Sequence, residues 1–257
     1  MSDSIKFVTY NILDGGLGRL DPIYETLLYL DADVVGLCEV DDPVGAQYIA
    51  DKLGVELLLA ESPTGSHHVA MMTKLPVRSM INLGVKFPSL SRAAMLCEVD
   101  TPRGPMRIVV IHLQAGFDHE PDRLAELDPI LEMLAESQTP TMIMGDLNAV
   151  APYHPFDADK LPEHRRQRLV DRGGKLDHDV IGRLTGDGWI DAYHFLRHDD
   201  PKHTFTTGFP ALRLDYIFIS QDLSSALVDA DVDTGGFSPY CSDHFPVWVS
   251  LGARPVS

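Results

Sequence analysis

Asp146 and Asn148 stand where an apolar run of the sequence ends. The run begins at Thr141 and reads TMIMG, a length and composition that predict a strand buried on both faces. Residues i and i+2 of an extended chain lie on one side, so we expect both side chains to point into a site at the carboxyl end of this strand. A carboxylate there can bind a hard cation or take a proton from water, and a carboxamide can donate to an oxyanion. The alternative is a Gly-Asp turn in which the asparagine is only the turn former.

Polar residues also stand at the ends of other predicted strands. The whole set is Asn11, Glu39, His112, Asp146, Asn148, Asp215, Asp243 and His244. Singly, each has a structural explanation: Asp215 can be an acid on an edge strand, and His112 a hydrogen-bonded histidine of the core. Together, they indicate one site that draws on most of the chain.

The chemistry of this set is that of a hard divalent cation beside histidine and carboxylate groups. Glu39, Asp243 and Asn11 can supply oxygen ligands, and the sequence has neither HxxxH nor CxxC spacing, which favours Mg²⁺ or Mn²⁺ over zinc. Histidines paired with carboxylates can protonate or polarise a phosphoryl oxygen.

The elements that must position these residues are mostly strands. Asp21-Pro22 and Asp42-Pro43 each predict a capped helix start, the second helix ending before Gly54. Further helices are expected at 122–135, where Pro129 kinks the helix or starts its second half, and at 179–184. The run from 55 to 113 resembles an antiparallel meander more than repeated βαβ units. The expected strands are 5–10, 34–40, 55–60, 69–73, 77–83, 93–99, 106–113, 204–206, 213–220, 226–232 and 245–251.

The segment from about 151 to 174 differs in composition from the rest of the chain. It is rich in proline, histidine and arginine, and we interpret it as an ordered surface insertion in a single domain that spans 1–257. Its basic cluster, at 164–168, can meet an anionic substrate or simply be solvated surface.

Composition limits the class of protein. The 257 residues include 21 basic and 38 acidic side chains, a net charge of -17, which argues against broad neutralisation of nucleic-acid phosphates. It does not exclude a nuclease, because a bound cation supplies positive charge locally. The three cysteines, Cys38, Cys97 and Cys241, have no metal-site spacing and fit buried thiols of a reducing compartment. With neither a signal peptide nor an apolar run of membrane-spanning length, we expect a cytoplasmic protein.

Six short motifs then carry a resemblance to a known family. In chain order they are TYNI with Asn11, GLCEV with Glu39, IHL with His112, GDLNA with Asp146 and Asn148, RLDYIF with Asp215, and SDHFPV with Asp243 and His244. Together they resemble the endonuclease/exonuclease/phosphatase superfamily, over residues 9 to 247. The resemblance implies an α/β (α+β) fold of the deoxyribonuclease-I-like kind: a four-layer sandwich of two mixed β-sheets flanked by helices.

The resemblance also implies a role for each matching residue. Glu39 would be the principal Mg²⁺ ligand, helped by Asn11 and Asp243. Asp146 would orient or deprotonate the attacking water, and Asn148 would hold that water or an equatorial oxygen. His244, oriented by Asp215, would contact the phosphate, and His112 would assist the phosphate or the leaving group. The segment LSRAA also resembles a phosphate-binding stretch of the family, which would make Arg92 a substrate ligand.

Two positions depart from the family pattern. Cys38 stands where family members often carry glutamine before the metal-binding glutamate, so its hydrogen bond is missing or comes from another group. Some nuclease members of the family pair this histidine with an acid on a preceding strand. Residues 65–68, GSHH, offer no such acid, so the sequence shows no partner that would keep His112 protonated.

We therefore predict a Mg²⁺- or Mn²⁺-dependent phosphohydrolase, and within that class a phosphodiesterase acting on a small or lipid-like phosphoester. The net acidity and the absence of interleaved basic and aromatic residues favour such a substrate over long duplex DNA. The alternative enzyme is a metal-dependent nuclease that uses the 165–168 loop. A non-catalytic binding module on the same fold is a third possibility, disfavoured because no metal or histidine position has been lost. The sequence does not indicate an oligomeric state.

Overall fold

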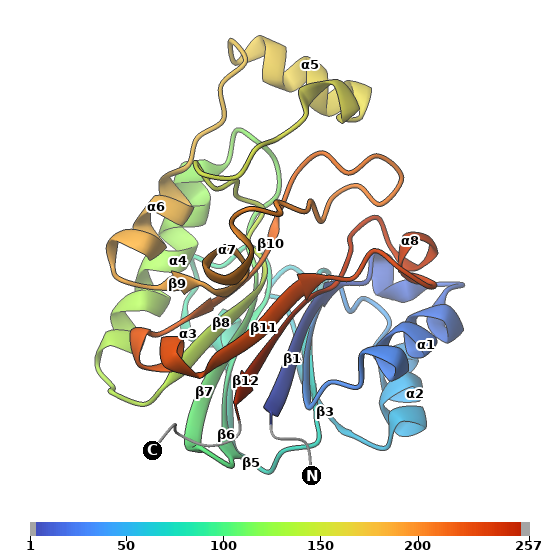
Figure 1. Cartoon of the computed structure of the whole chain (residues 1–257), viewed down its shortest axis with the longest axis vertical. Coiled ribbons are helices and arrows are strands. Elements are labelled where there is room, and N and C mark those ends of the chain that lie inside the picture. Colours follow the sequence, from blue (N-terminus) through green and yellow to red (C-terminus); the bar gives the residue numbers. More distant parts are fainter. Residues whose placement is uncertain (1–3, 253–257) are drawn as a thin grey trace.

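Two six-stranded sheets pack face to face, with helices on their outer surfaces (Figure 1). The structure is a computed structural model and describes residues 4–252; the outermost residues of the predicted 1–257 domain lie outside that range. Both sheets are mixed, because each contains one parallel pair of strands among antiparallel ones. The predicted four-layer, deoxyribonuclease-I-like architecture is confirmed.

The first sheet has the parallel pair β1 and β2 near its centre, and its other neighbouring strands are antiparallel. Its strands are, in spatial order, β11 (Leu227–Val232), β12 (Val247–Gly252), β1 (Ser4–Asn11), β2 (Val34–Cys38), β4 (Val69–Thr73) and β3 (Glu56–Ala60).

The second sheet repeats this plan, with the parallel pair β7 and β8 in the middle. Its strands are, in order, β5 (Val77–Asn82), β6 (Ala94–Thr101), β7 (Gly104–His112), β8 (Thr141–Asp146), β10 (Asp215–Ile219) and β9 (Ile190–Asp191).

Strand direction brings the polar strand ends to one edge of the molecule. The parallel strands β1, β2, β7 and β8 contribute residues at their carboxyl ends, whereas the antiparallel β10 and β12 contribute residues at their amino ends. In the second sheet, His112 is in register with Asp146, and Asp146 with Asp215. Residues paired across neighbouring strands share a face, so these three side chains form one row.

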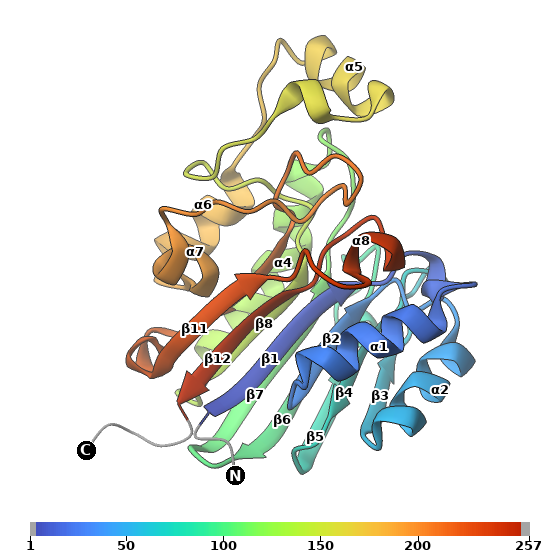
Figure 2. The same cartoon turned by 45° about the vertical axis from the view of Figure 1, so that its right-hand side comes forward.

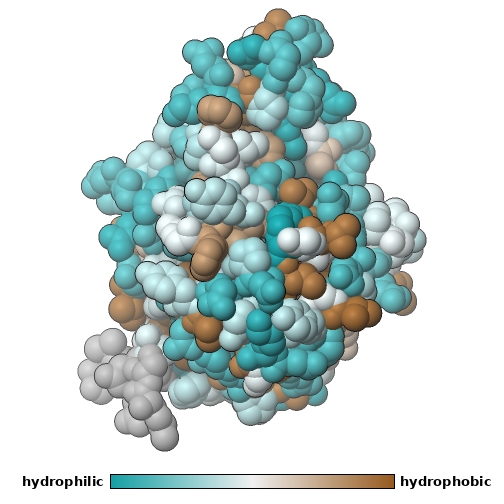
Figure 3. All heavy atoms as spheres, turned by 90° about the vertical axis from the view of Figure 1, so that its right-hand side faces the viewer, coloured by the Kyte–Doolittle hydropathy of each residue, from teal (hydrophilic) through white to brown (hydrophobic). Residues whose placement is uncertain are grey.

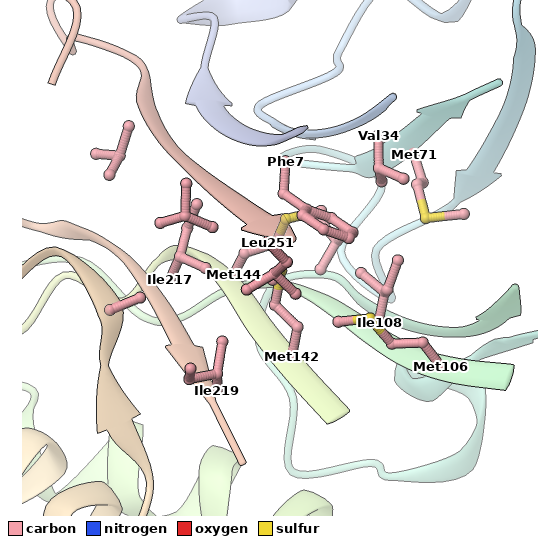
Figure 4. Packing of buried hydrophobic residues seen from close by; sticks show 14 of the residues in the cluster. Phe7, Val34, Met71, Met106, Ile108, Met142, Met144, Ile217, Ile219 and Leu251 are labelled. Carbon is pink, nitrogen blue, oxygen red and sulfur yellow. The ribbon is translucent and has the colours of Figure 1, made fainter. Parts of the chain in front are cut away.

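The space between the sheets is filled by large apolar side chains. Figure 4 shows Phe7 and Val34 of the first sheet facing Ile108, Met144 and others of the second. Gly36 permits this close approach, because a Cβ there would lie 2.8 Å from Met144 Cε. The side chains drawn there are almost wholly buried and include four methionines, whose flexible thioethers fill irregular gaps.

Helices cover the outer face of each sheet (Figure 2). On the first sheet, α1 (Leu20–Leu30) and α2 (Pro43–Leu53) bury Ile23 and Ile49 against Tyr10. On the second, α4 (Glu120–Ala135) and α6 (Asp179–Gly186) pack on β7 and β8. The remaining helices are short: η1 (Asp14–Gly16), α3 (Leu83–Lys86), η2 (Ala158–Lys160), α5 (Glu163–Asp171), α7 (Ala192–Arg197), η3 (Gln221–Ala226) and α8 (Ser238–Cys241).

Local signals succeeded at some helix ends and were wrong at others. The side chain of Asp42 caps α2 by accepting from Gly45 N, and Gly54 ends that helix with a φ of 69°, both as expected. The predicted cap at Asp21 is wrong, because α1 already begins at Leu20 and no side chain caps it. Pro129 lies inside one continuous helix, α4, which starts two residues earlier than predicted. The short helices α3, α7 and α8 were missed because four to six residues show no helical periodicity.

The expected strand at 204–206 is absent from the described part of the chain. Phe205 forms only isolated bridges, to Leu212 and His244, because the backbone folds back on itself between 205 and 212. The Thr204 hydroxyl accepts from Leu214 N and Asp215 N, which ties this loop to the start of β10.

The predicted insertion projects beyond the ends of the sheets and carries α5 at its tip (Figures 1 and 2). It is anchored by a small apolar cluster in which Leu161 and Leu169 pack with Phe117 and Phe205. Within residues 4–252, none of the helices combines the length and the apolar character that crossing a bilayer requires.

We expect Gly145→Ala to lower the free energy of unfolding by about 2–4 kcal/mol, because the new side chain adds backbone strain and a steric clash. Gly145 has a φ of 150°, and a Cβ there would lie 1.8 Å from the carbonyl oxygen of Ile111 on β7. Urea unfolding measures the change. Gly182→Ala, at an exposed helical glycine with nothing within 4 Å, is the matched control and should stabilise. Equal effects of the two variants would contradict this account of Gly145.

Candidate active site

Asp146 lies at the centre of the polar cluster and uses its two oxygens differently. Oδ1 accepts from the backbone N–H of Asn148 at 2.9 Å, which shapes the turn after β8. Oδ2 accepts from Asn11 Nδ2 at 3.0 Å and lies 3.5 Å from His112 Nε2 and 3.8 Å from His244 Nε2. One carboxylate thus closes a turn and also faces three side chains that come from both sheets.

The chain is not extended through Asn148, so the argument from i and i+2 positions is wrong there. β8 ends at Asp146, and Asn148 has a φ of 48°. Its side chain donates to the carbonyl oxygen of Leu113 at 3.1 Å, while its backbone N–H contacts Asp146. The turn interpretation and the site interpretation of this stretch therefore both apply, because Asp146 serves each with a different oxygen.

Glu39 sits in a sharp turn directly after β2, with a φ of 60°. Its Oε1 accepts from Asn11 Nδ2 at 3.2 Å, and its Oε2 accepts from Asp14 N at 3.2 Å. Glu39 thus receives hydrogen bonds from Asn11 and Asp14, although Cys38 stands at the position where family members often carry glutamine. Cys38 itself is buried and its thiol faces the carbonyl oxygen of Ile111 at 3.5 Å.

Arg92 and His112 form a second contact pair beside Glu39. Arg92 Nη1 lies 3.9 Å from Glu39 Oε1 and donates to the His112 ring. Burial and the positive charge of Arg92 hold the pKa of His112 well below its usual range. His112 is therefore neutral, and its approach to Asp146 is not an ion pair. This agrees with the lack of an acidic partner at 65–68.

His244 is oriented by Asp215. Its Nδ1 donates to Asp215 Oδ2 at 2.7 Å, and its Nε2 faces Asp146 and Asp243 without a hydrogen bond to either. Burial lowers the pKa of His244, but the carboxylates of Asp215 and Asp146 outweigh that effect and raise it above its ordinary value. Burial, with the charge of Asp215, raises the pKa of Asp146, against the opposing effect of His244. The ring is thus positively charged and presents an unused N–H.

All the residues predicted for the site lie in this connected cluster. They are Asn11, Glu39, Arg92, His112, Asp146, Asn148, Asp215, Asp243 and His244. The fold thus brings all nine side chains to one place.

Several side chains of the cluster offer ligands for a metal ion. Asp146, Asp215 and His244 have ligand atoms within 4.8 Å of one another, but the bond from His244 Nδ1 to Asp215 already occupies two of these residues. Glu39 and Asp243 offer oxygens only, and Asp243 Oδ1 is buried with no hydrogen-bond partner among the described residues. Mg²⁺ and Mn²⁺ prefer oxygen donors, so the chemistry of these two carboxylates suits such an ion better than a set that includes His244.

The side chain of Asn11 is not oriented as expected for a metal ligand. Its Nδ2, rather than its Oδ1, faces the carboxylates of Glu39 and Asp146, and its Oδ1 accepts from Leu13 N at 3.0 Å. In this arrangement it positions the two carboxylates, and its oxygen can reach a cation only if the amide turns over.

Several residues that support the site were not predicted from the sequence. Glu126 of α4 is buried and accepts from Ser91 N and Gln114 N, both at 2.9 Å, which fixes the segments that carry Arg92 and His112. Buried acids inside an amphipathic helix are unusual, so an acid on its apolar face was the available clue.

A buried ion pair supports the start of β10. Arg213 is fully buried and donates through both Nη atoms to Asp191, at 3.0 Å for the Nη1 bond, while its guanidinium lies 4.3 Å from the Tyr216 ring centre. The bidentate geometry and stacking hold the strand two residues before Asp215.

The sequence over residues 8–244 matches the model of the Endonuclease/Exonuclease/phosphatase family. The chain belongs to that family. It is a hydrolase of phosphoester bonds. The predicted family and the predicted enzyme class are both confirmed.

Several known proteins resemble this one over nearly its whole length. The uncharacterized protein YbhP of Escherichia coli is 23% identical over 95% of this chain and 94% of its own. Among solved structures, the 3' phosphatase NExo from Neisseria, bound to a product DNA hairpin, is 17% identical with a TM-score of 0.71, over 96% of this chain and 99% of that one. An AP endonuclease from Archaeoglobus fulgidus is 16% identical with a TM-score of 0.71 and the same coverage. At these identities, the structural likeness establishes the fold alone.

We expect Arg213→Met to lower the free energy of unfolding by about 3–5 kcal/mol, because it leaves the charge of Asp191 buried and unpaired. Arg183→Met is the matched control: Arg183 pairs with Asp128 at 2.9 Å near the surface, and an exposed pair contributes at most about 1 kcal/mol. Urea unfolding of both variants makes the comparison. A loss at Arg213 no larger than that at Arg183 would contradict the supporting role.

Proposed function

We propose that this protein is a Mg²⁺- or Mn²⁺-dependent phosphodiesterase that acts on a small or lipid-like phosphoester. The observation that carries the proposal is the opposition of Asp146 Oδ2 and His244 Nε2, 3.8 Å apart and not hydrogen-bonded to each other. One is a carboxylate that can accept a proton, and the other is a charged N–H that can donate to an oxyanion. Hydrolysis by in-line attack of water needs both functions.

In the proposed mechanism Asp146 orients a water and takes its proton, helped by the hydrogen bonds from Asn11 and Asn148 that fix its carboxylate. His244 donates from Nε2 to an oxygen of the phosphoryl group, and Asp215 keeps the ring charged and oriented. Arg92 and neutral His112 provide N–H groups to the phosphate or the leaving oxygen. Donors fixed before the reaction stabilise the charge that builds up on these oxygens.

The cation of the family would be held by Glu39 and Asp243. Asp243 Oδ1 fits this assignment, because it is buried, accepts no hydrogen bond from the described residues and lies 4.0 Å from His244 Nε2, too far for a hydrogen bond. When bound, a divalent cation would supply Lewis-acid stabilisation of charge on the phosphoryl oxygens.

The rim of the site supports a substrate with an apolar part. Leu17, 76% exposed, follows the turn that bonds to Glu39, and Tyr240, 77% exposed, precedes Asp243. Arg19 links the two segments by donating to Cys241 O and Leu13 O. Figure 3, which faces the right-hand side of Figure 1, shows separate hydrophobic residues exposed among hydrophilic ones on that face. An apolar rim, together with the net charge of -17, favours a small or lipid-like phosphoester over duplex DNA.

A nuclease activity is the second candidate, and the insertion is the observation that favours it. Arg165 and Arg168 line a cavity there, and Arg165 Cζ lies 4.4 Å from the ring centre of Phe205, which contacts the His244 ring, so these arginines can contact a phosphate chain. The solved relatives include a protein bound to a DNA hairpin, which is a property of that protein. Degradation of oligonucleotides at low enzyme concentration would select this alternative.

We also propose that the chain acts as one domain in the cytoplasm. The cluster combines side chains from both sheets, which supports the first statement. Cys38, Cys97 and Cys241 are all free thiols and all buried, which supports a reducing compartment.

We expect Asp146→Ala and His244→Ala each to lower hydrolysis of bis-p-nitrophenyl phosphate at least ~100-fold, the scale on which general acid and base groups act. Asp199→Ala and His198→Ala are the matched controls, with side chains 94% and 63% exposed, and should keep the wild-type rate. Nitrophenol release in Mg²⁺ or Mn²⁺ measures all four. Near-wild-type rates at 146 or 244 would refute the assignment. A wild-type protein that hydrolyses neither this diester nor p-nitrophenyl phosphate would favour a binding module.

We expect Mn²⁺ or Mg²⁺ to raise the Tm of the wild-type protein, because a ligand at a hundred times its Kd stabilises the folded state by about 2.7 kcal/mol. Glu39→Gln and Asp243→Asn should require higher ion concentrations for the same shift. Asp199→Asn, whose side chain is 94% exposed, should behave as the wild type. Unchanged ion dependence in the two site variants would remove Glu39 and Asp243 from the metal site.

A further inference from the structure

A cavity of about 220 Å³ lies between the insertion and the loop that follows β7. From the insertion it is lined by His164, Arg165 and Arg168, and from the loop by Ala115, Gly116 and Phe117. The lining is basic on one side and uncharged on the other. Such a cavity suits an anion, because none of its lining side chains is acidic.

Arg165 and Arg168 differ from every other arginine between residues 4 and 252. All the others donate through their guanidinium groups to a carboxylate, a carbonyl oxygen or, for Arg92, a histidine ring. In the same part of the chain, the guanidinium groups of these two have neither an ion pair nor a hydrogen bond. The two lie three residues apart on α5, where their like charges repel modestly, and both guanidinium groups are left free to contact an anionic ligand.

Arg165 is also joined to the candidate active site through one aromatic ring. Its Cζ lies 4.4 Å from the ring centre of Phe205, and that ring lies 4.9 Å from the ring centre of His244. Burial lowers the pKa of Arg165, and the carboxylates of Asp146 and Asp243 oppose that shift. Arg165, which lines the cavity, is therefore separated from His244 by a single aromatic ring, that of Phe205.

We propose that Arg165 and Arg168 bind a second phosphate group of the substrate, next to the phosphoester that is hydrolysed. This rests on the proposed phosphodiesterase function and specifies its substrate class. The scissile phosphate would lie against His244 and Arg92, so a group beyond Phe205 must be a different one. Guanidinium groups suit phosphate because they offer paired N–H donors in a plane and keep their charge.

The same chemistry arises in a nucleotide and in a phosphorylated polyol or lipid headgroup. What the cavity selects is a phosphate held a short linker away from the scissile bond. The linker must pass Phe205, whose ring can contact an apolar or planar part of it.

The test compares two matched pairs of chromogenic diesters. One pair is thymidine 5'-(p-nitrophenyl phosphate) with and without a 3'-phosphate; the other is p-nitrophenyl propyl phosphate with and without a phosphate on the far carbon. For the wild type we expect the second phosphate to raise kcat/KM by about tenfold or more, mainly through a lower KM, since hydrogen bonds between charged groups are stronger than neutral ones. An advantage in the first pair alone indicates a nucleotide, and in the second alone a polyol or lipid headgroup; either supports the subsite.

The variants separate binding from folding. Arg165→Ala and Arg168→Ala should reduce the advantage of the second phosphate to less than twofold, and Arg165→Lys should restore part of it. Arg166→Ala is the matched control on the same helix, because Arg166 pairs with Glu163, and it should keep the full advantage. Thermal melts of each variant check that the fold is intact.

The experiment distinguishes a failure of the proposed function from a failure of the proposed phosphate subsite. A wild-type protein that hydrolyses none of the four diesters overturns the proposed function, and the subsite with it. A wild-type protein that hydrolyses both members of each pair equally well overturns only the subsite. A phosphate advantage that survives in Arg165→Ala and Arg168→Ala also overturns it.

Discussion

The candidate site depends on one constraint, the shared end of the two central parallel strand pairs. β1 and β2 in one sheet, and β7 and β8 in the other, finish at the same edge of the molecule, and β10 and β12 begin there. The row of His112, Asp146 and Asp215 follows directly from strand register. Asp146 then links this row to Asn11 and His244, which belong to the other side of the sandwich. Without that edge, the polar residues would be isolated strand-end groups.

Electrostatics at this edge give similar residues different states. His112 and His244 are both buried and both approach Asp146, yet their pKa values move in opposite directions. Burial lowers the pKa of both rings; at His112 the charge of Arg92 adds to this effect, whereas at His244 the carboxylates of Asp215 and Asp146 outweigh it. Two histidines that look equivalent in the sequence are therefore a neutral group and a cation, which suits them to different tasks around one phosphate.

The sequence was sufficient to predict the sheets and the clustering of the polar residues, because both follow from apolar runs and from their ends. It failed where the backbone leaves regular geometry, as at Asn148, whose left-handed turn cannot be read from a periodicity. It also failed where a residue acts across a long separation in the chain. The bond from Arg213 to Asp191 and the stacking of Arg165 on Phe205 require knowledge of the folded loops. The basic cluster at 164–168 is evident from the sequence, but only the folded structure distinguishes its paired arginine, Arg166, from the unpaired Arg165 and Arg168.

The packing between the sheets has an implication for how this enzyme could adapt. The carboxylates and histidines of the cluster are divided between the two sheets, so any sliding of one sheet over the other changes the distances between them. What resists sliding is the apolar layer, where Met144 reaches over Gly36 and other methionines fill the gaps. Replacing those pliable side chains with branched ones would stiffen the layer. Evolution could thus adjust activity to growth temperature through residues that never meet the substrate.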